Sequence, residues 1–278
     1  MTQRSEQPID LVLLGGAWWK ARKGGKGVGR VAEIFQPLLH ATRAGSMPGV
    51  KIHIPLCIGS TPKQMAHSAL ENLYTRIPGL REGKVLLLVW AWSAGLHIAR
   101  FMEELHGRPL WSSVGNLAGL AANGVEYPEF VGLLRHRAWP ILSGLATNKL
   151  TWPAEAVAKD IFGTTVDGVP NKFAWMLDVG EQKAEPFWFV AGVFVAGLKE
   201  LMAPRPFQHA TLMTMIGTAD PFVGRNVTYR GEYEQERFVL DGAPHGAHLI
   251  PDHRPDWGFK YEVWFESQVS VHRQRTAA

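Results

Sequence analysis

Apolar residues along this chain gather in short runs, and many of the segments between these runs carry apolar positions at helical spacing. Short apolar runs are typical of buried strands in a parallel sheet. The predicted strands cover residues 9–14, 50–56, 85–90, 112–121, 210–216 and 236–240. Segments such as 28–42 and 63–77 have the spacing of helices packed on one face. This alternation predicts an α/β fold with a mostly parallel central sheet flanked by helices.

One long stretch, residues 125–208, interrupts the alternation between the fourth and fifth predicted strands and is rich in Trp, Phe and Gly. We expect it to form a helical cap inserted into a core made of residues 1–124 and 209–278. Its apolar run Phe187–Leu198 is twelve residues long, which is too short to span a bilayer. The run therefore predicts a buried cap helix, with a mobile lipid-facing lid as the alternative.

The most informative position is Ser93, which follows the apolar run 85–90 and precedes helical spacing that begins at Leu96. Ala91 and Gly95 stand two positions to either side, and small residues are what a sharp strand-to-helix turn requires. A helix starting here directs its free N–H groups and positive dipole end at any anion that forms near the serine. The pattern A-x-S-x-G thus favours a nucleophile, although it departs from G-x-S-x-G and a structural serine stays open.

Two further residues follow Ser93 in an informative order. Asp220 lies in a loop directly after the predicted strand 210–216, and such loops at the carboxyl end of a parallel sheet gather catalytic groups. The alternative is an Asp that stabilises a turn before a proline. His245 lies in a Gly-Ala-Pro-His-Gly loop after the last predicted strand, and His248, three residues later, is its rival.

The strand, serine and helix, followed by an acid and then a histidine, resemble the α/β-hydrolase fold family. The resemblance implies a catalytic triad of Ser93, Asp220 and His245. In this triad His245 is the general base for Ser93, and Asp220 holds the imidazole in the required tautomer.

The glycines after the first predicted strand add an oxyanion hole to this resemblance. Gly15-Gly16-Ala17 is similar to the turn that supplies one backbone donor in the family, although Gly15 stands where His is usual. The implied donors are the N–H groups of Ala17 and Ala94. Because this turn follows the very first strand, the sheet is expected to lack the first two strands of larger family members.

Three tryptophans flank the predicted chemistry, namely Trp18, Trp19 and Trp92. We expect them to bind an apolar or ring-containing substrate group, with ordinary core packing as the alternative. The expected activity is hydrolysis of a carboxylic ester through an acyl-enzyme on Ser93. A thioesterase that releases or cyclises an acyl chain from a carrier is a close alternative. A non-hydrolytic lyase, a cyclase or a binding protein on the same scaffold is a further one.

Charge changes this picture only locally. The 278 residues carry a formal net charge of +4, with 46% hydrophobic and 19% charged residues, which is ordinary globular usage. Five basic residues share the first predicted loop: Lys20, Arg22, Lys23, Lys26 and Arg30. A solvated loop explains them, and a site for an acyl carrier is the alternative. Nucleic acid is not an expected partner, because no base-stacking aromatics are interleaved with these charges.

The single cysteine, Cys57, excludes an internal disulfide, and no clustered Cys and His spacing indicates a metal. We therefore expect neither a metal nor a cofactor. The first residues, MTQRSEQP, are polar and contain no apolar segment of the kind a signal peptide requires. A cytoplasmic location is the resulting expectation.

Overall fold

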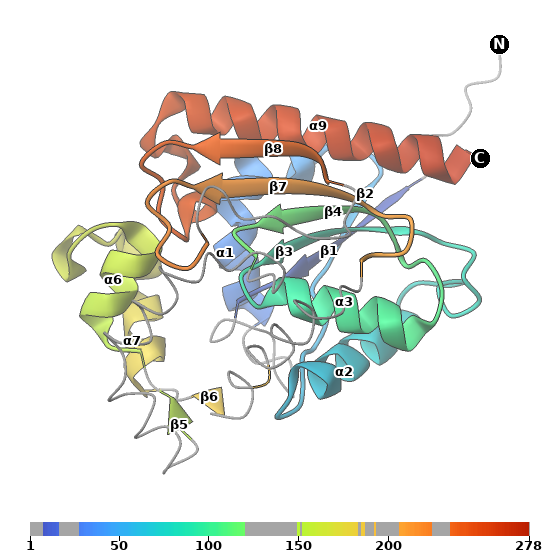
Figure 1. The fold of residues 1–278 in the computed structure, drawn as a ribbon, viewed down its shortest axis with the longest axis horizontal. Helices are drawn as coiled ribbons and strands as arrows, with labels where there is room; N and C mark the ends of the chain where they lie inside the picture. The colour runs from blue at the N-terminus through green and yellow to red at the C-terminus, as the bar shows by residue number, and fades with distance from the viewer. Residues whose placement is uncertain are drawn as a thin grey trace.

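A computed structural model describes residues 8–16, 28–119, 149–150, 152–182, 185–186, 192, 206–223 and 234–277. Its centre is a six-stranded sheet of order β2-β1-β3-β4-β7-β8, in which every neighbouring pair is parallel (Figure 1). The strands are β1 (Ile9–Leu14), β2 (Val50–His53), β3 (Leu87–Trp92), β4 (Trp111–Leu117), β7 (Thr211–Gly217) and β8 (Glu234–Leu240). The predicted fold class, a parallel sheet flanked by helices, is confirmed.

Helices cover both faces of the sheet because the strands send alternate apolar side chains to opposite sides. Leu11 and Leu13 of β1 join one core cluster with residues of α1 (Val28–Ala41) and α9 (Pro255–Ala277). Val12 and Leu14 join the other, with residues of α2 (Pro62–Tyr74) and α3 (Gly95–His106). Figure 1 shows α9 along one side of the sheet and α2 and α3 along the other.

The described part of 125–208 contains two helices, α6 (Ala154–Phe162) and α7 (Ala174–Gln182), beyond the carboxyl ends of the strands (Figure 1). It also contains a small antiparallel pair, β5 (Lys149–Leu150) with β6 (Glu185–Pro186), which the sequence pattern did not predict. Except for Gly192, the run Phe187–Leu198 lies outside the described residues. The division into core and cap stays a prediction.

Short 3₁₀ helices connect the larger elements: η2 (Ala44–Ser46), η4 (Val166–Gly168), η5 (Asn171–Phe173), η6 (Ala247–Leu249) and η7 (Pro251–His253). Within the described ranges, no helix is both long and apolar enough to cross a bilayer.

One boundary near the site and one whole helix differ from the sequence-based expectation. The strand predicted at 85–90 is β3, which continues to Trp92 because it pairs with β1 on one side and β4 on the other. The turn is therefore tighter than expected and begins at Ser93 itself. The 23-residue helix α9 was not predicted, although Trp257, Tyr261, Trp264 and Phe265 recur at helical spacing and are buried.

Candidate active site

Ser93 occupies the sharp turn between β3 and α3. Its φ is +54°, which places a residue other than glycine in the left-handed region. That conformation costs about 1–2 kcal/mol for an L-residue, so the surroundings must hold it. The Ser93 N–H donates to the Leu117 carbonyl at 3.2 Å, and the Ser93 carbonyl accepts from the Leu96 N–H at 3.2 Å. Both backbone groups are thus anchored, one to β4 and one to the first turn of α3.

The end of β1 lies directly against this turn. A Cβ on Gly95 would sit 2.6 Å from the Leu14 carbonyl oxygen and 3.0 Å from that of Gly15. A Cβ on Gly16 would sit 3.3 Å from Cβ of Ser93. Glycine at position 95 therefore allows β1 and α3 to approach backbone to backbone, and Gly16 brings the loop after β1 alongside the serine.

Of the two expected oxyanion donors, only Ala94 lies in the described structure. It caps the N-terminus of α3, and no described group accepts a hydrogen bond from its N–H. Ala17, together with Trp18 and Trp19, lies outside the described residues. Ala94 stands at the N-terminus of α3, where the helix dipole favours a negative charge next to Ser93.

Asp220 follows β7 and is held by its own loop. Its Oδ1 accepts hydrogen bonds from the N–H groups of Phe222 at 2.8 Å and Val223 at 3.1 Å. Its Oδ2 lies 2.8 Å from Nδ1 of His245. Two backbone donors on one oxygen fix the carboxylate plane, so the other oxygen is aimed at the imidazole. The side chains are almost fully buried, at 2% exposure for His245 and 0% for Asp220.

The His245 loop is clamped between β7 and α6. The Ala243 carbonyl accepts from the Ala219 N–H at 3.1 Å and lies so close to Gly217 that any Cβ there would overlap it. On the other side, the His245 N–H donates to the Asp160 carbonyl at 3.3 Å, and the next N–H in the loop donates to a carbonyl of α6 as well. The loop that carries the imidazole is therefore held on one side by the end of β7 and on the other by α6.

His248, the alternative base, has different surroundings. Its ring packs 4.8 Å from the Trp92 ring and 5.7 Å from the Phe35 ring, and among the described residues its Nε2 has no hydrogen-bond partner. Burial, together with the nearby His245, lowers the pKa of His248 to about 3. Of the two histidines, His245 is the one that is hydrogen-bonded to a carboxylate.

Aromatic rings surround His245. Trp92 is fully buried, and its indole N–H donates to the His245 carbonyl at 3.1 Å, so this ring presents no surface to a substrate. Phe222 stands edge-on, 4.7 Å from the His245 ring, and Trp152 stands edge-on, 5.3 Å from Phe222. Phe222 and Trp152 are only half-buried. The pattern of the sequence singled out neither of these two for the site, and the one local signal was that Phe222 follows Asp220 by two residues.

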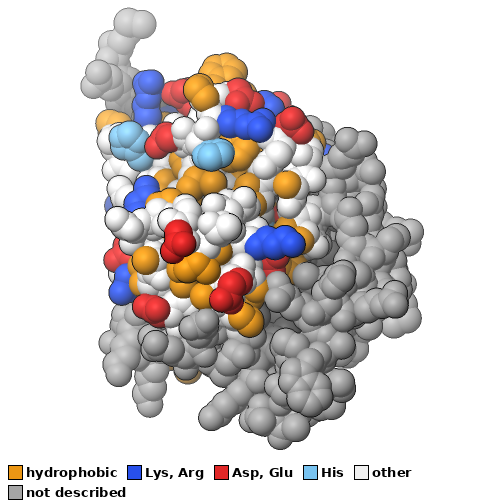
Figure 2. All heavy atoms as spheres, turned by 90° about the vertical axis from the view of Figure 1, so that its left-hand side faces the viewer, with side chains coloured by type: hydrophobic (Ala, Val, Ile, Leu, Met, Phe, Trp, Pro, Cys, Tyr) orange, Lys and Arg blue, Asp and Glu red, His pale blue; other side chains and the backbone are white. Residues whose placement is uncertain are grey.

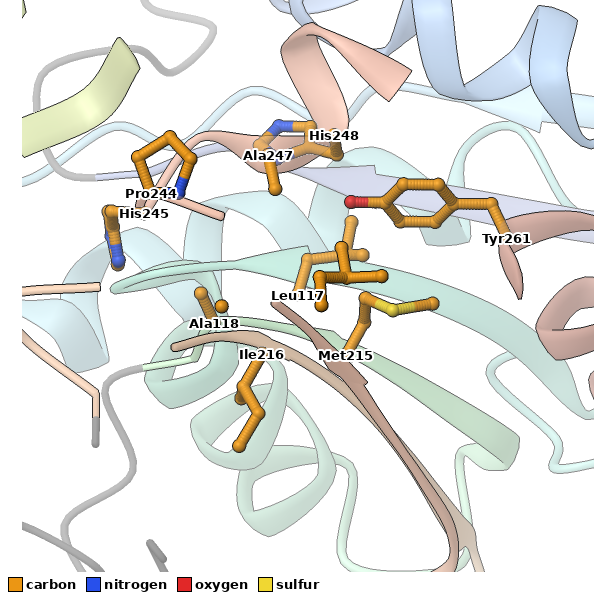
Figure 3. Close-up of a pocket in the computed structure, with 11 residues that line it drawn as sticks. Leu117, Ala118, Met215, Ile216, Pro244, His245, Ala247, His248 and Tyr261 are labelled. Atoms are coloured by element: carbon orange, nitrogen blue, oxygen red, sulfur yellow. The ribbon is translucent and has the colours of Figure 1, made fainter. Parts of the chain in front are cut away.

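A small cavity lies behind the His245 loop, at the carboxyl ends of β4 and β7 (Figure 3). Its lining includes Ala118, Met215, Pro244, His248 and Tyr261. The space holds about one water molecule, far less than a drug-sized ligand needs. Within the described residues no cluster of three His, Cys, Asp or Glu side chains is arranged to hold a metal.

The outer face at this end of the sheet is mixed in character. Figure 2 shows apolar, acidic and basic side chains interspersed over its described part, with no field of a single charge. The described part of this face therefore gives no electrostatic preference for an anionic or a cationic partner.

No family model matches the sequence, and no curated protein is similar to it in sequence. Its structure, however, resembles those of many solved proteins. An esterase from Exiguobacterium antarcticum superposes with a TM-score of 0.58 and 12% identity, over 94% of this chain and 93% of that one. A monoacylglycerol lipase from Paleococcus ferrophilus gives 0.55 and 16%, over 95% and 96%. A bromoperoxidase from Bacillus anthracis gives 0.56 and 13%, over 94% and 92%.

These proteins and this chain share the α/β-hydrolase fold. The resemblance stated from Ser93, Asp220 and His245 is therefore confirmed at the level of the fold. Because the similar structures include an esterase, a lipase and a bromoperoxidase, the fold leaves the reaction to be argued from the site.

Proposed function

We propose that this protein is a serine hydrolase that cleaves a carboxylic ester through an acyl-enzyme on Ser93. The observation that carries the proposal is the buried Asp220–His245 hydrogen bond of 2.8 Å. This hydrogen bond lies at the carboxyl ends of the strands, the same end of the sheet at which β3 turns sharply at Ser93. The Trp92 indole, one residue before Ser93, contacts the main chain of His245 and so joins the two halves of the site.

The proposed reaction assigns each residue one task. Nε2 of His245 takes the proton of the Ser93 hydroxyl while Oγ attacks the ester carbonyl carbon. Asp220 accepts the hydrogen bond from Nδ1–H and stabilises the imidazolium that forms. The Ala94 N–H, with Ala17 as its expected partner, stabilises the oxyanion.

Collapse of the tetrahedral intermediate breaks the bond to the alcohol, which leaves with the proton from His245. Water then attacks the acyl-enzyme and gives its proton to His245, and the carboxylic acid is released as Ser93 regains its hydrogen. No cofactor takes part in these steps.

The substrate class we propose is an ester with an apolar or ring-containing group. Phe222 and Trp152 support it, because both rings are half-buried in a row that starts at His245. Trp18 and Trp19 extend this apolar lining in the proposal. A partly exposed aromatic beside the general base is well placed to contact the acyl or alcohol group next to the scissile bond.

A thioester on an acyl carrier is the second candidate, since the same triad would cleave it. The basic residues Lys20, Arg22 and Lys23, close in sequence to the expected oxyanion turn, favour it. Charge reversal at these three positions separates the two. The charge reversal is expected to slow hydrolysis of a carrier-bound thioester at least tenfold and to leave the rate of hydrolysis of a neutral aryl ester unchanged.

The test is hydrolysis of a series of aryl and alkyl esters and of the matching thioesters. We expect turnover by the wild type and at least a thousandfold loss in Ser93→Ala. Ser46→Ala, an exposed serine of η2, is the matched control and is expected to keep full activity. Turnover that is equal in the wild type and Ser93→Ala would overturn the proposal.

A further inference from the structure

Two tryptophans of β3 are equally buried but have different hydrogen-bond partners. Trp90 and Trp92 are both fully buried, and they belong to the same core cluster on one face of the sheet. The indole N–H of Trp90 donates to Oε1 of Gln268 at 3.2 Å. The indole N–H of Trp92 donates to the carbonyl oxygen of His245 at 3.1 Å. The Trp90 bond thus connects β3 to the helix α9, and the Trp92 bond connects β3 to the loop that carries His245, the proposed general base.

We propose that Trp92 is a positioning residue that fixes the His245 imidazole relative to Ser93 through the main chain of His245. The inference rests on the proposed function in that it takes Ser93 as nucleophile and His245 as base. Trp92 directly precedes Ser93, so the residue that leads into the nucleophile also holds the backbone of its partner. A shift of the Ser93 backbone is therefore transmitted to the backbone of His245.

The Trp92 ring is itself immobilised. It lies 5.8 Å from the His245 ring, and the His248 ring stands edge-on to it at 4.8 Å. His248 in turn packs against Phe35 of α1 at 5.7 Å. This row of rings leaves the indole little freedom to rotate away from the carbonyl.

Other contacts of the loop do not replace this one. Asp220 holds the imidazole at Nδ1, and α6 holds the backbone N–H of His245. Neither contact comes from β3, the strand that leads into Ser93. The hydrogen bond from Trp92 fixes the main chain of His245 relative to β3. The distance from the Ser93 hydroxyl to Nε2 of His245 depends on that position. Misplacing reacting groups by about 1 Å costs on the order of a hundredfold in rate.

The experiment compares Trp92→Phe with Trp90→Phe, because each variant keeps an aromatic ring and loses one buried indole hydrogen bond of nearly equal length. Both are expected to lower the melting temperature to a similar extent. Trp92→Phe is expected to lower kcat at least tenfold with KM within about twofold, whereas Trp90→Phe keeps kcat within about twofold. Equal losses of kcat in the two variants, or unchanged kcat in Trp92→Phe, would overturn the inference.

A second readout does not depend on turnover. The Nδ1 proton of His245, bonded to Asp220, is expected to give a far-downfield NMR signal that disappears in His245→Ala. Trp92→Phe is expected to broaden or shift this signal, and Trp90→Phe to leave it in place. An unchanged signal in Trp92→Phe would overturn the positioning role even if no ester were cleaved. Absence of turnover in the wild type would instead overturn the proposed function.

If the Phe variant does not fold, benzothienylalanine at position 92 keeps the shape of the ring and removes only the N–H donor. The same loss of kcat and change of the Nδ1 proton signal are expected. Wild-type values for both in this analogue would overturn the inference.

Discussion

Nδ1 of His245 lies 2.8 Å from Oδ2 of Asp220, although the two residues belong to loops that follow different strands, β7 and β8. These strands are parallel neighbours, so their carboxyl ends bring the two loops together. The other carboxylate oxygen is held by two backbone N–H groups. The pair is therefore oriented before any substrate binds, which is what a base with a fixed tautomer requires.

Asp220→Asn tests this orientation. The amide oxygen can still accept from Phe222 and Val223, but the NH₂ group then faces Nδ1 and favours the opposite tautomer of His245. We expect kcat to fall by a factor on the order of 10⁴ while the protein stays folded. Steady-state kinetics with an aryl ester measures the loss.

Asp241→Asn is the control for that variant. Asp241 lies in the loop after β8, is exposed, and accepts a hydrogen bond from the Thr218 hydroxyl. Its replacement is expected to leave kcat within about twofold, because exposed polar contacts contribute little. Similar losses in the two variants would contradict a specific role for Asp220.

Gly95→Ala tests the close approach of β1 and α3. The added Cβ would meet the Leu14 carbonyl oxygen at 2.6 Å, so the end of β1 or the start of α3 must move. We expect a destabilisation of about 1–3 kcal/mol and at least a tenfold loss of kcat, because both parts of the oxyanion region shift. Gly258→Ala in α9 meets nothing within 4 Å and is expected to be neutral or stabilising. Full activity in Gly95→Ala would contradict the proposed geometry.

The buried His248 predicts a pH dependence of stability. Burial lowers its pKa in the folded protein to about 3, whereas the unfolded chain takes up the proton near 6.5. Between these values the unfolded state binds more protons, so the free energy of unfolding falls as the pH falls. The loss from this group amounts to about 2–3 kcal/mol between pH 6.5 and 4.5.

His248→Leu removes that contribution, and denaturant unfolding at several pH values detects it. The slope of the unfolding free energy against pH measures the number of protons taken up on unfolding. In His248→Leu this number is expected to be smaller by about one in this range. His67→Leu changes an exposed histidine of α2 and is expected to leave the slope unaltered. A wild-type slope in His248→Leu would show that His248 does not stay neutral in the folded protein.

Phe222→Ala tests the substrate class. Removing the ring beside His245 takes away apolar contact surface, so kcat/KM is expected to drop roughly tenfold or more for long-chain or aryl esters and much less for an acetyl ester. Phe259→Ala, which removes a ring that is 66% exposed on α9, is the control. Equal effects of Phe222→Ala on short and long substrates would argue against an apolar site at this position.

The fold was predictable from the sequence because apolar residues follow different patterns in buried strands and in helices. Apolar runs located all six strands of the sheet, and Ser93 with Gly95 located the turn. The end of β3 was placed two residues early, at position 90, because Ala91 was interpreted as a small residue of the turn. Pairing of Ala91 with β1 and β4, and of Trp92 with β4, keeps both residues in the strand. The helix α9 was missed although its buried aromatic side chains carry the helical period.

Contacts between residues far apart in the chain were not predictable in the same way. Nothing in the local pattern around Trp92 indicates that its N–H meets the His245 carbonyl, because that contact depends on how β3 and the loop after β8 are placed in space. For the same reason the sequence left His245 and His248 as alternatives. They differ in their neighbours, a carboxylate for one and two aromatic rings for the other.

The most direct measurement is intact-mass analysis after treatment with a fluorophosphonate probe, which reacts with activated serines. We expect one adduct on the wild type, none on Ser93→Ala, much slower labelling of His245→Ala, and labelling of His248→Ala at close to the wild-type rate. A folded wild-type protein that takes up no probe, or a Ser93→Ala variant that is labelled as fast as the wild type, would contradict the account.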